Sequence, residues 1–258
     1  MLLESALVSV PVFVLVVFRL AGLMAFAPLF GSGRIPRRVK AMLAVVLALG
    51  MMPGVPAPRM PESIWELTIG IAGEVAFGVA MGMVLSFVFI AAQWAGEMIG
   101  QQMGFNLSEV FDPQFGQGGS LIGELYFMLT LATFLLIGAH REMLLAVRMS
   151  FDALPLLSVG LDRPLLDTLL GLFQSCTILA VQLAAPLLVT MLVVDLALGC
   201  IGKAMPQMNV MTTGMSIRSL MGMVVLVVGI ALTGSVLNEE LGRAMKQFTV
   251  HVASPAEQ

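Results

Sequence analysis

Long apolar runs separated by short polar stretches are the main pattern of this chain. Three intervals without Asp, Glu, Lys or Arg reach 20 residues or more: 75–96, 168–194 and 219–238. A helix that crosses the apolar core of a bilayer needs about 20 apolar residues. The pattern predicts an all-α, polytopic membrane protein of about six apolar helical elements. These lie at roughly 5–30, 39–52, 64–103, 121–139, 165–200 and 215–238.

Two of these elements do not have the length of a simple span. The second is short because the proline-rich stretch 52–61 (MPGVPAPRMP) stops it, whereas 64–104 contains no proline and would form a helix about 61 Å long. A hydrocarbon core is about 30 Å thick. If all six elements alternated across the membrane, the Lys and Arg residues would divide evenly, Arg19 left aside, and give no orientation. We infer that some of these helices are buried against protein.

Composition supports the membrane assignment. Of the 258 residues, 59% are hydrophobic and 11% are charged, and the mean hydropathy is +0.98. Soluble domains carry about 25% charged residues. No linker is long enough to divide the chain, so we expect one domain over 1–258. The net charge of −3 and the absence of a basic block give no indication of nucleic-acid binding.

Small residues recur at every fourth position along the third element. Gly78 and Gly82 belong to one row, and Gly96, Gly100 and Gly104 belong to another. Small residues at this spacing let helix backbones approach closely, which favours helix association in membranes. We expect these glycines to lie in helix–helix contacts, either within the chain or with neighbouring helical subunits.

Several charged residues lie inside or at the ends of apolar elements. Charges at membrane depth are costly and indicate a function or a partner. A proton relay in a transporter and ion pairs that hold subunits together are both possible roles, and we favour the ion pairs. The residues concerned are Arg19, Glu74, Glu97, Glu124 and Asp195.

The sequence contains no recognisable catalytic motif. His140 and His251 stand far apart without neighbouring ligand-type residues, and no phosphate loop, dinucleotide fingerprint, zinc helix or nucleophile elbow is present. We predict no enzyme activity, no cofactor and no metal site. Met205, Met208 and Met211 have a spacing that could bind Cu(I) through soft sulfur ligands. We favour the simpler interpretation that methionine fills irregular apolar gaps.

Four stretches of the sequence bear on the family of the chain: 27–44 (APLFGSGRIPRRVKAMLA), 95–119 (AGEMIGQQMGFNLSEVFDPQFGQGG), 151–156 (FDALPL) and 205–218 (MPQMNVMTTGMSIR). They resemble the FliR family of flagellar biosynthetic proteins, and the likeness covers nearly the whole chain. The export-gate subunits of injectisomes belong to the same superfamily. One departure is 138–142 (GAHRE), where the family often has Asn-Gly-His.

The resemblance implies a non-enzymatic subunit of the flagellar type III export gate, in the bacterial inner membrane at the basal body. It implies bent helical hairpins packed in a hetero-oligomeric complex, with FliP, FliQ and FlhB as partner subunits. Membrane lipid and unfolded exported proteins are the other expected partners. The alternatives are a secondary transporter or Cu(I) carrier using Glu74, Asp195 and the methionines, or the injectisome paralogue of the same gate.

The resemblance also implies a loop that plugs the central pore, which by position is 105–119. Phenylalanine rings would supply apolar contact, and glycines would supply backbone freedom. The Asp-Pro pair favours a turn. The alternative is a loop packed on its own subunit. The expected plug residues are Phe105, Phe111, Asp112, Pro113, Phe115, Gly116, Gly118 and Gly119.

Overall fold

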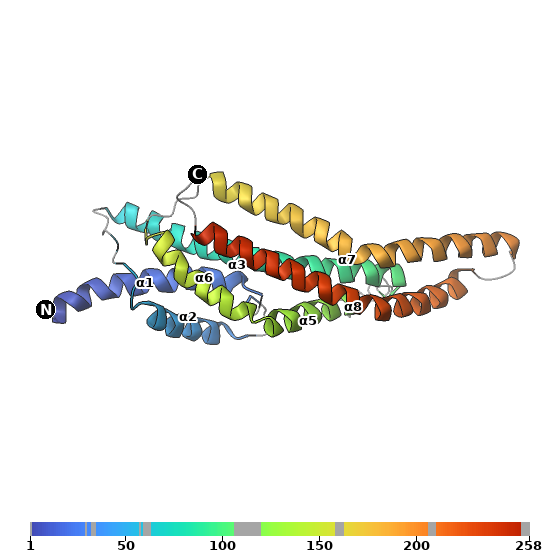
Figure 1. Cartoon of the computed structure of the whole chain (residues 1–258), viewed down its shortest axis with the longest axis horizontal. Helices are drawn as coiled ribbons and strands as arrows, with labels where there is room; N and C mark the ends of the chain where they lie inside the picture. The colour runs from blue at the N-terminus through green and yellow to red at the C-terminus, as the bar shows by residue number, and fades with distance from the viewer. Residues whose placement is uncertain are drawn as a thin grey trace. The chain divides into compact units, whose positions relative to one another are not determined.

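The computed structural model describes residues 2–28, 30–31, 35–56, 58, 63–105, 120–157, 163–205 and 210–253. Within these ranges every regular element is an α-helix (Figure 1), so the predicted all-α class is confirmed. In chain order the helices are α1 (Leu2–Phe26), α2 (Arg37–Met51), α3 (Ile64–Met103), α5 (Leu121–Leu136), α6 (Ala139–Ala153), α7 (Arg163–Ala204) and α8 (Val210–Ala253).

Three helices in the described ranges are long and apolar enough to cross a membrane. They contain the candidate spans Ile64–Met103, Leu170–Ala204 and Thr213–Ile230. Helices α5 and α6 form a fourth candidate if they are counted together, although the chain bends by 66° between them. Helix α2 has 15 residues and a length of about 22 Å, which is too short to cross. The six apolar elements therefore do not correspond to six spans.

Helix α6 is the element that the apolar pattern did not predict. Its sequence, AHREMLLAVRMSFDA, mixes charged and apolar residues, so it forms no apolar run. Met143, Ala146, Val147 and Phe151 are nevertheless buried, and their spacing places them on one helical face. Gly138 precedes the helix with φ of 71°, a left-handed conformation that favours glycine and allows the chain to turn between α5 and α6.

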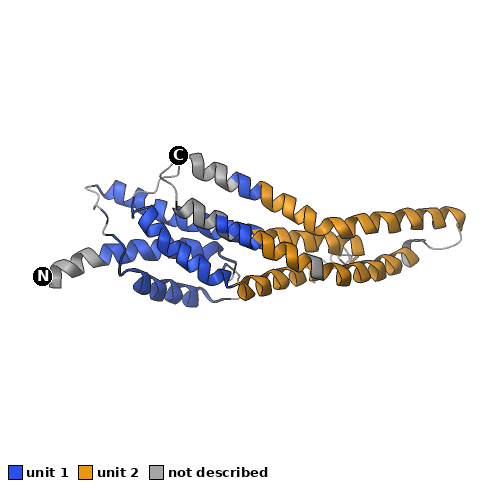
Figure 2. Cartoon of the chain, in the orientation of Figure 1, with its two compact units in different colours: residues 1–87, 138–173, 241–258 blue, residues 88–137, 174–240 orange. Residues whose placement is uncertain are grey.

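The chain forms two compact units (Figure 2). Unit 1 comprises 1–87, 138–173 and 241–258, and unit 2 comprises 88–137 and 174–240. Helices α3, α7 and α8 each contribute residues to both units. Because these helices continue from one unit into the other, the single domain over 1–258 stays our prediction.

The core of unit 1 is built on α1. This helix buries Leu15, Leu20 and Leu23, and each fully buried leucine contributes about 1.5–3 kcal/mol. Helix α2 packs on α1 and buries its small residues Ala44 and Ala48. Small side chains at a contact let the two helices lie close together.

The core of unit 2 contains an aromatic cluster and a methionine contact. The ring of Phe89 lies edge-on to the rings of Phe127 and Phe134, with centroids 5.6 Å apart in both cases. Such aromatic pairs contribute about 0.5–1.5 kcal/mol beyond the area they bury. Met103 and Met191 are fully buried, and they fill the space beside Gly222 of α8.

Candidate functional site

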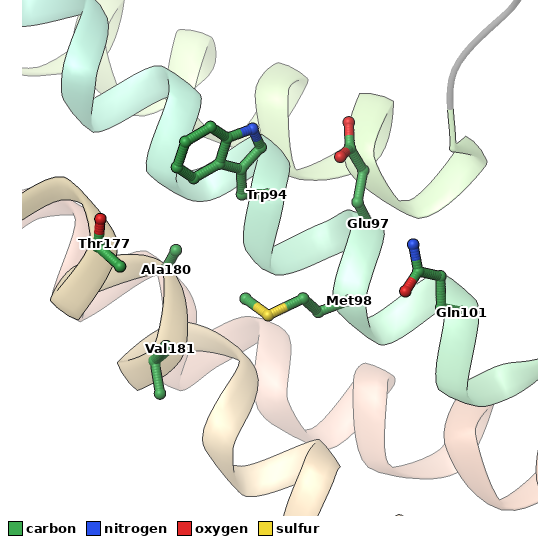
Figure 3. Close-up of a pocket in the computed structure, with 7 residues that line it drawn as sticks. All are labelled: Trp94, Glu97, Met98, Gln101, Thr177, Ala180 and Val181. Carbon is green, nitrogen blue, oxygen red and sulfur yellow. The ribbon is translucent and has the colours of Figure 1, made fainter. Parts of the chain in front are cut away.

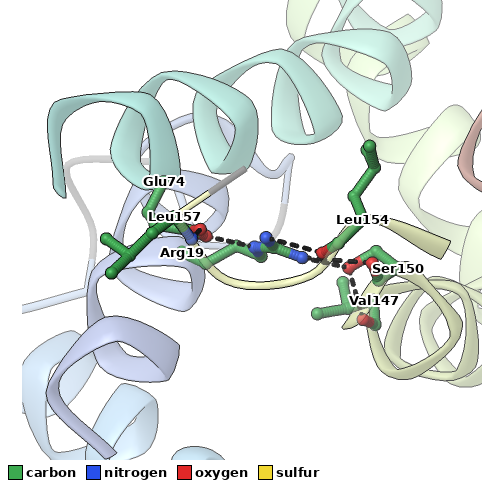
Figure 4. A network of polar contacts seen from close by, with 6 residues as sticks. All are labelled: Arg19, Glu74, Val147, Ser150, Leu154 and Leu157. Atoms are coloured by element: carbon green, nitrogen blue, oxygen red, sulfur yellow. Dashed lines mark hydrogen bonds and ion pairs between the residues drawn. The ribbon is translucent and has the colours of Figure 1, made fainter. Parts of the chain in front are cut away.

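Arg19 of α1 and Glu74 of α3 form a fully buried ion pair in unit 1 (Figure 4). The Arg19 Nε donates to the Glu74 Oε2 over 2.5 Å, and neither side chain has exposed surface. The Arg19 Nη1 donates to the carbonyl and hydroxyl oxygens of Ser150, and Nη2 donates to the carbonyl oxygen of Leu154. Buried charges are tolerated when their hydrogen-bonding groups are satisfied in this way.

The same pair fixes the turn that follows α6. The Glu74 Oε1 accepts a hydrogen bond from the backbone N–H of Leu157 over 2.8 Å. Leu157 has φ of 65°, a left-handed conformation that costs an L residue about 1–2 kcal/mol. The Arg19 guanidinium also lies over the rings of Phe77 and Phe151, at 5.0 and 4.6 Å from their centroids. The network joins segments of one chain, whereas the sequence suggested ion pairs between subunits.

Gly78 and Gly82 bring α3 against the backbone of α1. A Cβ atom on Gly82 would stand 2.6 Å from the carbonyl oxygen of Leu23, and one on Gly78 would collide with the carbonyl oxygen of Arg19. Only glycine fits at these positions without a shift of the helices. Since Gly78 lies one turn beyond Glu74, the close crossing also brings the two charged side chains to the same level.

The second glycine row has two different roles in unit 2. A Cβ atom on Gly96 would stand 2.6 Å from the carbonyl oxygen of Ile122, so this glycine lets α3 approach the start of α5. Gly100 is buried within α3. Gly104 follows the last residue of α3 with φ of 80°, the left-handed position at which helices often end. The spacing predicted a packing role for Gly104 and did not predict this role in ending the helix.

Most of the predicted plug loop lies outside the described residues. Phe105 is described: it is half-buried, and its N–H donates to the carbonyl oxygen of Gly100 over 3.1 Å. The plug therefore stays a prediction. The predicted residues outside the described ranges are Phe111, Asp112, Pro113, Phe115, Gly116, Gly118 and Gly119.

Side-chain hydrogen bonds lie on both sides of this loop, within unit 2. The Ser219 Oγ of α8 donates to the carbonyl oxygen of Met103, the last residue of α3, over 2.9 Å. On the other side, the Ser120 Oγ accepts from the N–H of Gly123 and caps the start of α5. Sequence reasoning missed both serines. The Ser120 cap has a sequence signal, because serine directly precedes an apolar helix.

Asp195 of α7 forms an ion pair with Arg218 of α8. The Oδ1 and Nε atoms are 2.6 Å apart, and both side chains are partly exposed. Arg218 was not among the predicted site residues. Its position directly before an uncharged apolar run of α8 is the signal that could have identified it, since Asp195 directly follows such a run in α7.

Glu97 lines a cavity of about 230 Å³ in unit 2 (Figure 3). The side chain is half-buried, and its stem lies against Gly123 of α5. The other lining residues are mostly apolar, and they include neither a nucleophile–base pair nor a cluster of carboxylates. They are Trp94, Met98 and Gln101 of α3 and Thr177, Ala180 and Val181 of α7.

The residues expected for a copper site are only partly described. Met205 is exposed at the end of α7, Met208 lies outside the described ranges, and the side chain of Met211 is not described. Among the described residues, no group of three or more His, Cys, Asp or Glu side chains is placed to hold a metal ion.

Known proteins match most of the chain. The family described as bacterial export proteins, family 1, matches residues 10–244. The chain belongs to this family. The flagellar biosynthetic protein FliR of Escherichia coli (strain K12) is 27% identical over 205 residues, which are 79% of this chain and 78% of that protein. The FliR protein of Bacillus subtilis (strain 168) is 28% identical over 224 residues, with coverage of 84% and 85%.

A further relative of this export family comes from outside the flagellar proteins. The surface presentation of antigens protein SpaR of Shigella flexneri is 25% identical over 211 residues, which are 82% of each chain. The resemblance to the FliR family is thus confirmed. Family membership and the apolar helices make this chain a multi-pass inner-membrane component of a bacterial export apparatus. They do not favour the transporter or copper-carrier alternative.

Proposed function

We propose that this chain is a non-enzymatic structural subunit of the flagellar type III export gate. The observation that carries the proposal is the match of residues 10–244 to the bacterial export proteins, family 1. The FliR proteins of Escherichia coli and Bacillus subtilis match about four fifths of the chain at 27% and 28% identity, against 25% for SpaR, and most of the related proteins carry the name FliR. The flagellum is therefore better supported than an injectisome.

In this proposal FliP, FliQ and FlhB are the partner subunits, and unfolded exported proteins pass through the shared pore. The exposed apolar surface supports a role among other helices. Only 17% of the span Thr213–Ile230 is buried within the chain, and only 33% of an 18-residue apolar window within Leu170–Ala204. Helices this poorly covered need lipid or the helices of neighbouring subunits against them.

Residues 105–119 close the pore of the resting gate in this proposal. The composition suits a seal, because three phenylalanines offer apolar contact and the segment carries no Lys or Arg that would have to be desolvated. The hydrogen bond from Ser219 to the carbonyl oxygen of Met103 supports the proposal, because it ties the chain before the loop to α8.

Removal of the loop should separate sealing from assembly. We expect that a gate lacking 111–119, or carrying Phe111→Ala and Phe115→Ala, assembles with its partners but leaks small ions when the membrane is energised. Each fully buried ring contributes about 3–5 kcal/mol of contact that the alanine variant would lose. The helix contacts at Gly78 and Gly96 lie outside the deletion and should remain. The measurements are conductance and yield of the complex on the same samples.

Leu136→Ala provides a matched control for the loss of apolar volume. Leu136 lies at the exposed end of α5, so this variant should assemble and stay tight. An assembled gate without the loop that also stays tight would contradict the plug. Failure to assemble, with no leak, would assign the loop to packing within the subunit.

A further inference from the structure

Helix α2 presents an exposed apolar face that no described part of the chain covers. Met42 is 69% exposed and Val46 is 61% exposed, and a Cβ atom on Gly50 would have no neighbour within 4 Å. The exposed side chains fall on one side of the helix, and the buried Ala44 and Ala48 fall on the other. The exposed apolar residues are Val39, Met42, Val45, Val46 and Leu49.

Contacts at two places hold α2 in this orientation within unit 1. Its small residues pack on α1, and the Arg148 Nη2 of α6 donates to the carbonyl oxygen of Gly54, just beyond the end of α2, over 3.1 Å. The helix cannot turn its apolar face inward without breaking these contacts. The face is therefore held in a fixed position at the surface of unit 1.

Cations stand at one end of this surface. Arg37 and Arg38 are exposed in the first turn of α2, and Lys40 is half-buried beside them. The first turn contains no acid, and 5–61 contain no Asp or Glu. Positive side chains at a helix N-terminus oppose the helix dipole, so they do not stabilise α2. Arg38 lies one turn before Met42 and hence on the exposed face.

We propose that this surface binds an anionic phospholipid. Arg38 holds the phosphate of the headgroup, Arg37 adds positive charge from the neighbouring side of the same first turn, and the acyl chains lie along Val39, Met42 and Val46. Guanidinium groups pair with phosphate through two parallel hydrogen bonds, which suits arginine to this task.

The shape and length of the surface favour a lipid over a protein partner. A phospholipid carries its charge at one end and is apolar elsewhere, and the exposed face of α2 has the same distribution. The helix is about 22 Å long, and the hydrocarbon core of a bilayer is about 30 Å thick. If the cations lie at one headgroup layer, the apolar face therefore ends inside the hydrocarbon core. Basic residues beside membrane helices attract anionic headgroups in this way.

The test compares lipid binding by charge variants of the purified full chain. The chain in a neutral detergent is titrated with phosphatidylglycerol or phosphatidylcholine, and bound lipid is measured by native mass spectrometry. We expect Arg37→Gln with Arg38→Gln to weaken phosphatidylglycerol binding by roughly 30-fold and to leave phosphatidylcholine binding unchanged. The matched control is Arg141→Gln, which removes a 78% exposed cation of α6 in the same unit and should change neither.

Three outcomes would overturn the proposal. Equal phosphatidylglycerol binding by the double variant and the control would show that the α2 cations do not hold the headgroup. Competition by glycerol phosphate as strong as that by the whole lipid would show anion binding without a role for the apolar face. When the double variant is co-expressed with the partner subunits, loss of a partner from the purified complex, with lipid binding intact, would show that the face is a protein interface. The thermal stability of the double variant should not fall, because the substitutions relieve unfavourable charge at the helix N-terminus.

Discussion

At the scale of single residues, the Arg19–Glu74 pair is fully buried within unit 1. Taking two charges out of water costs several kcal/mol per ion, and their attraction offsets this only when the remaining hydrogen-bonding groups are satisfied. The oxygens of Ser150 and Leu154 and the N–H of Leu157 meet that condition. The pair therefore fixes how α1, α3, α6 and the turn after α6 lie together, and it adds little net stability.

Breaking the pair on one side should be severe. Glu74→Ala leaves the Arg19 charge buried without its carboxylate, so we expect a loss of about 3–5 kcal/mol in the free energy of unfolding. Replacing both residues by apolar ones, Arg19→Met with Glu74→Leu, should cost much less. Thermal and denaturant unfolding of the detergent-solubilised chain measures the difference.

Glu142→Ala is the control for this prediction. Glu142 is exposed and contacts Arg141 at 3.8 Å, and exposed pairs of this kind contribute about 0–1 kcal/mol. Equal effects of Glu74→Ala and Glu142→Ala would contradict the view that burial makes the first pair essential.

The sequence identified both charges of this pair but not the pairing. Arg19 and Glu74 each stand alone in an apolar run, and this can be read directly from the sequence. Their contact depends on how α1 crosses α3, and no spacing in the sequence records that crossing. The same holds for Asp195 and Arg218, which meet only because α7 and α8 pack together.

At the scale of elements, the crossing of α1 and α3 depends on glycine. Gly78→Ala should force the two helices apart, because the added Cβ atom would collide with the carbonyl oxygen of Arg19. Extra volume at a tight contact typically costs about 1–3 kcal/mol, and here it would also pull Arg19 away from Glu74. Unfolding measurements on the purified chain test this prediction.

Gly199→Ala is the matched control on an open helix surface. A Cβ atom on Gly199 of α7 would have no neighbour within 4 Å. Alanine favours a helix by up to about 1 kcal/mol over glycine, so this variant should be at least as stable as the original chain. The close crossing would be contradicted if Gly78→Ala were tolerated as well as Gly199→Ala.

Element boundaries were predictable where apolar runs defined them and not elsewhere. The run 64–103 coincides with α3. Helix α8 continues to Ala253, well beyond the expected end at 238, because charged residues follow its apolar run and hide the helix from a hydropathy pattern. Helix α6 was missed for the same reason, although its buried face has a helical period that an amphipathic search would detect.

At the scale of the whole molecule, the hydropathy pattern predicted the all-α membrane class, and motifs predicted the family. The stretches around 95–119 and 205–218 indicated the FliR family, and the match over residues 10–244 confirms it. The plug stays a prediction, because most of its residues lie outside the described ranges. No residue pattern within this sequence identifies the partner subunits.

We propose that this chain works as one subunit of a hetero-oligomeric export gate. The most direct test is native mass spectrometry of the tagged chain after co-expression with FliP and FliQ from the same genome. We predict a single large complex that contains all three proteins and no metal. A monomer or homodimer that carries stoichiometric copper, with FliP and FliQ left unbound, would contradict the account.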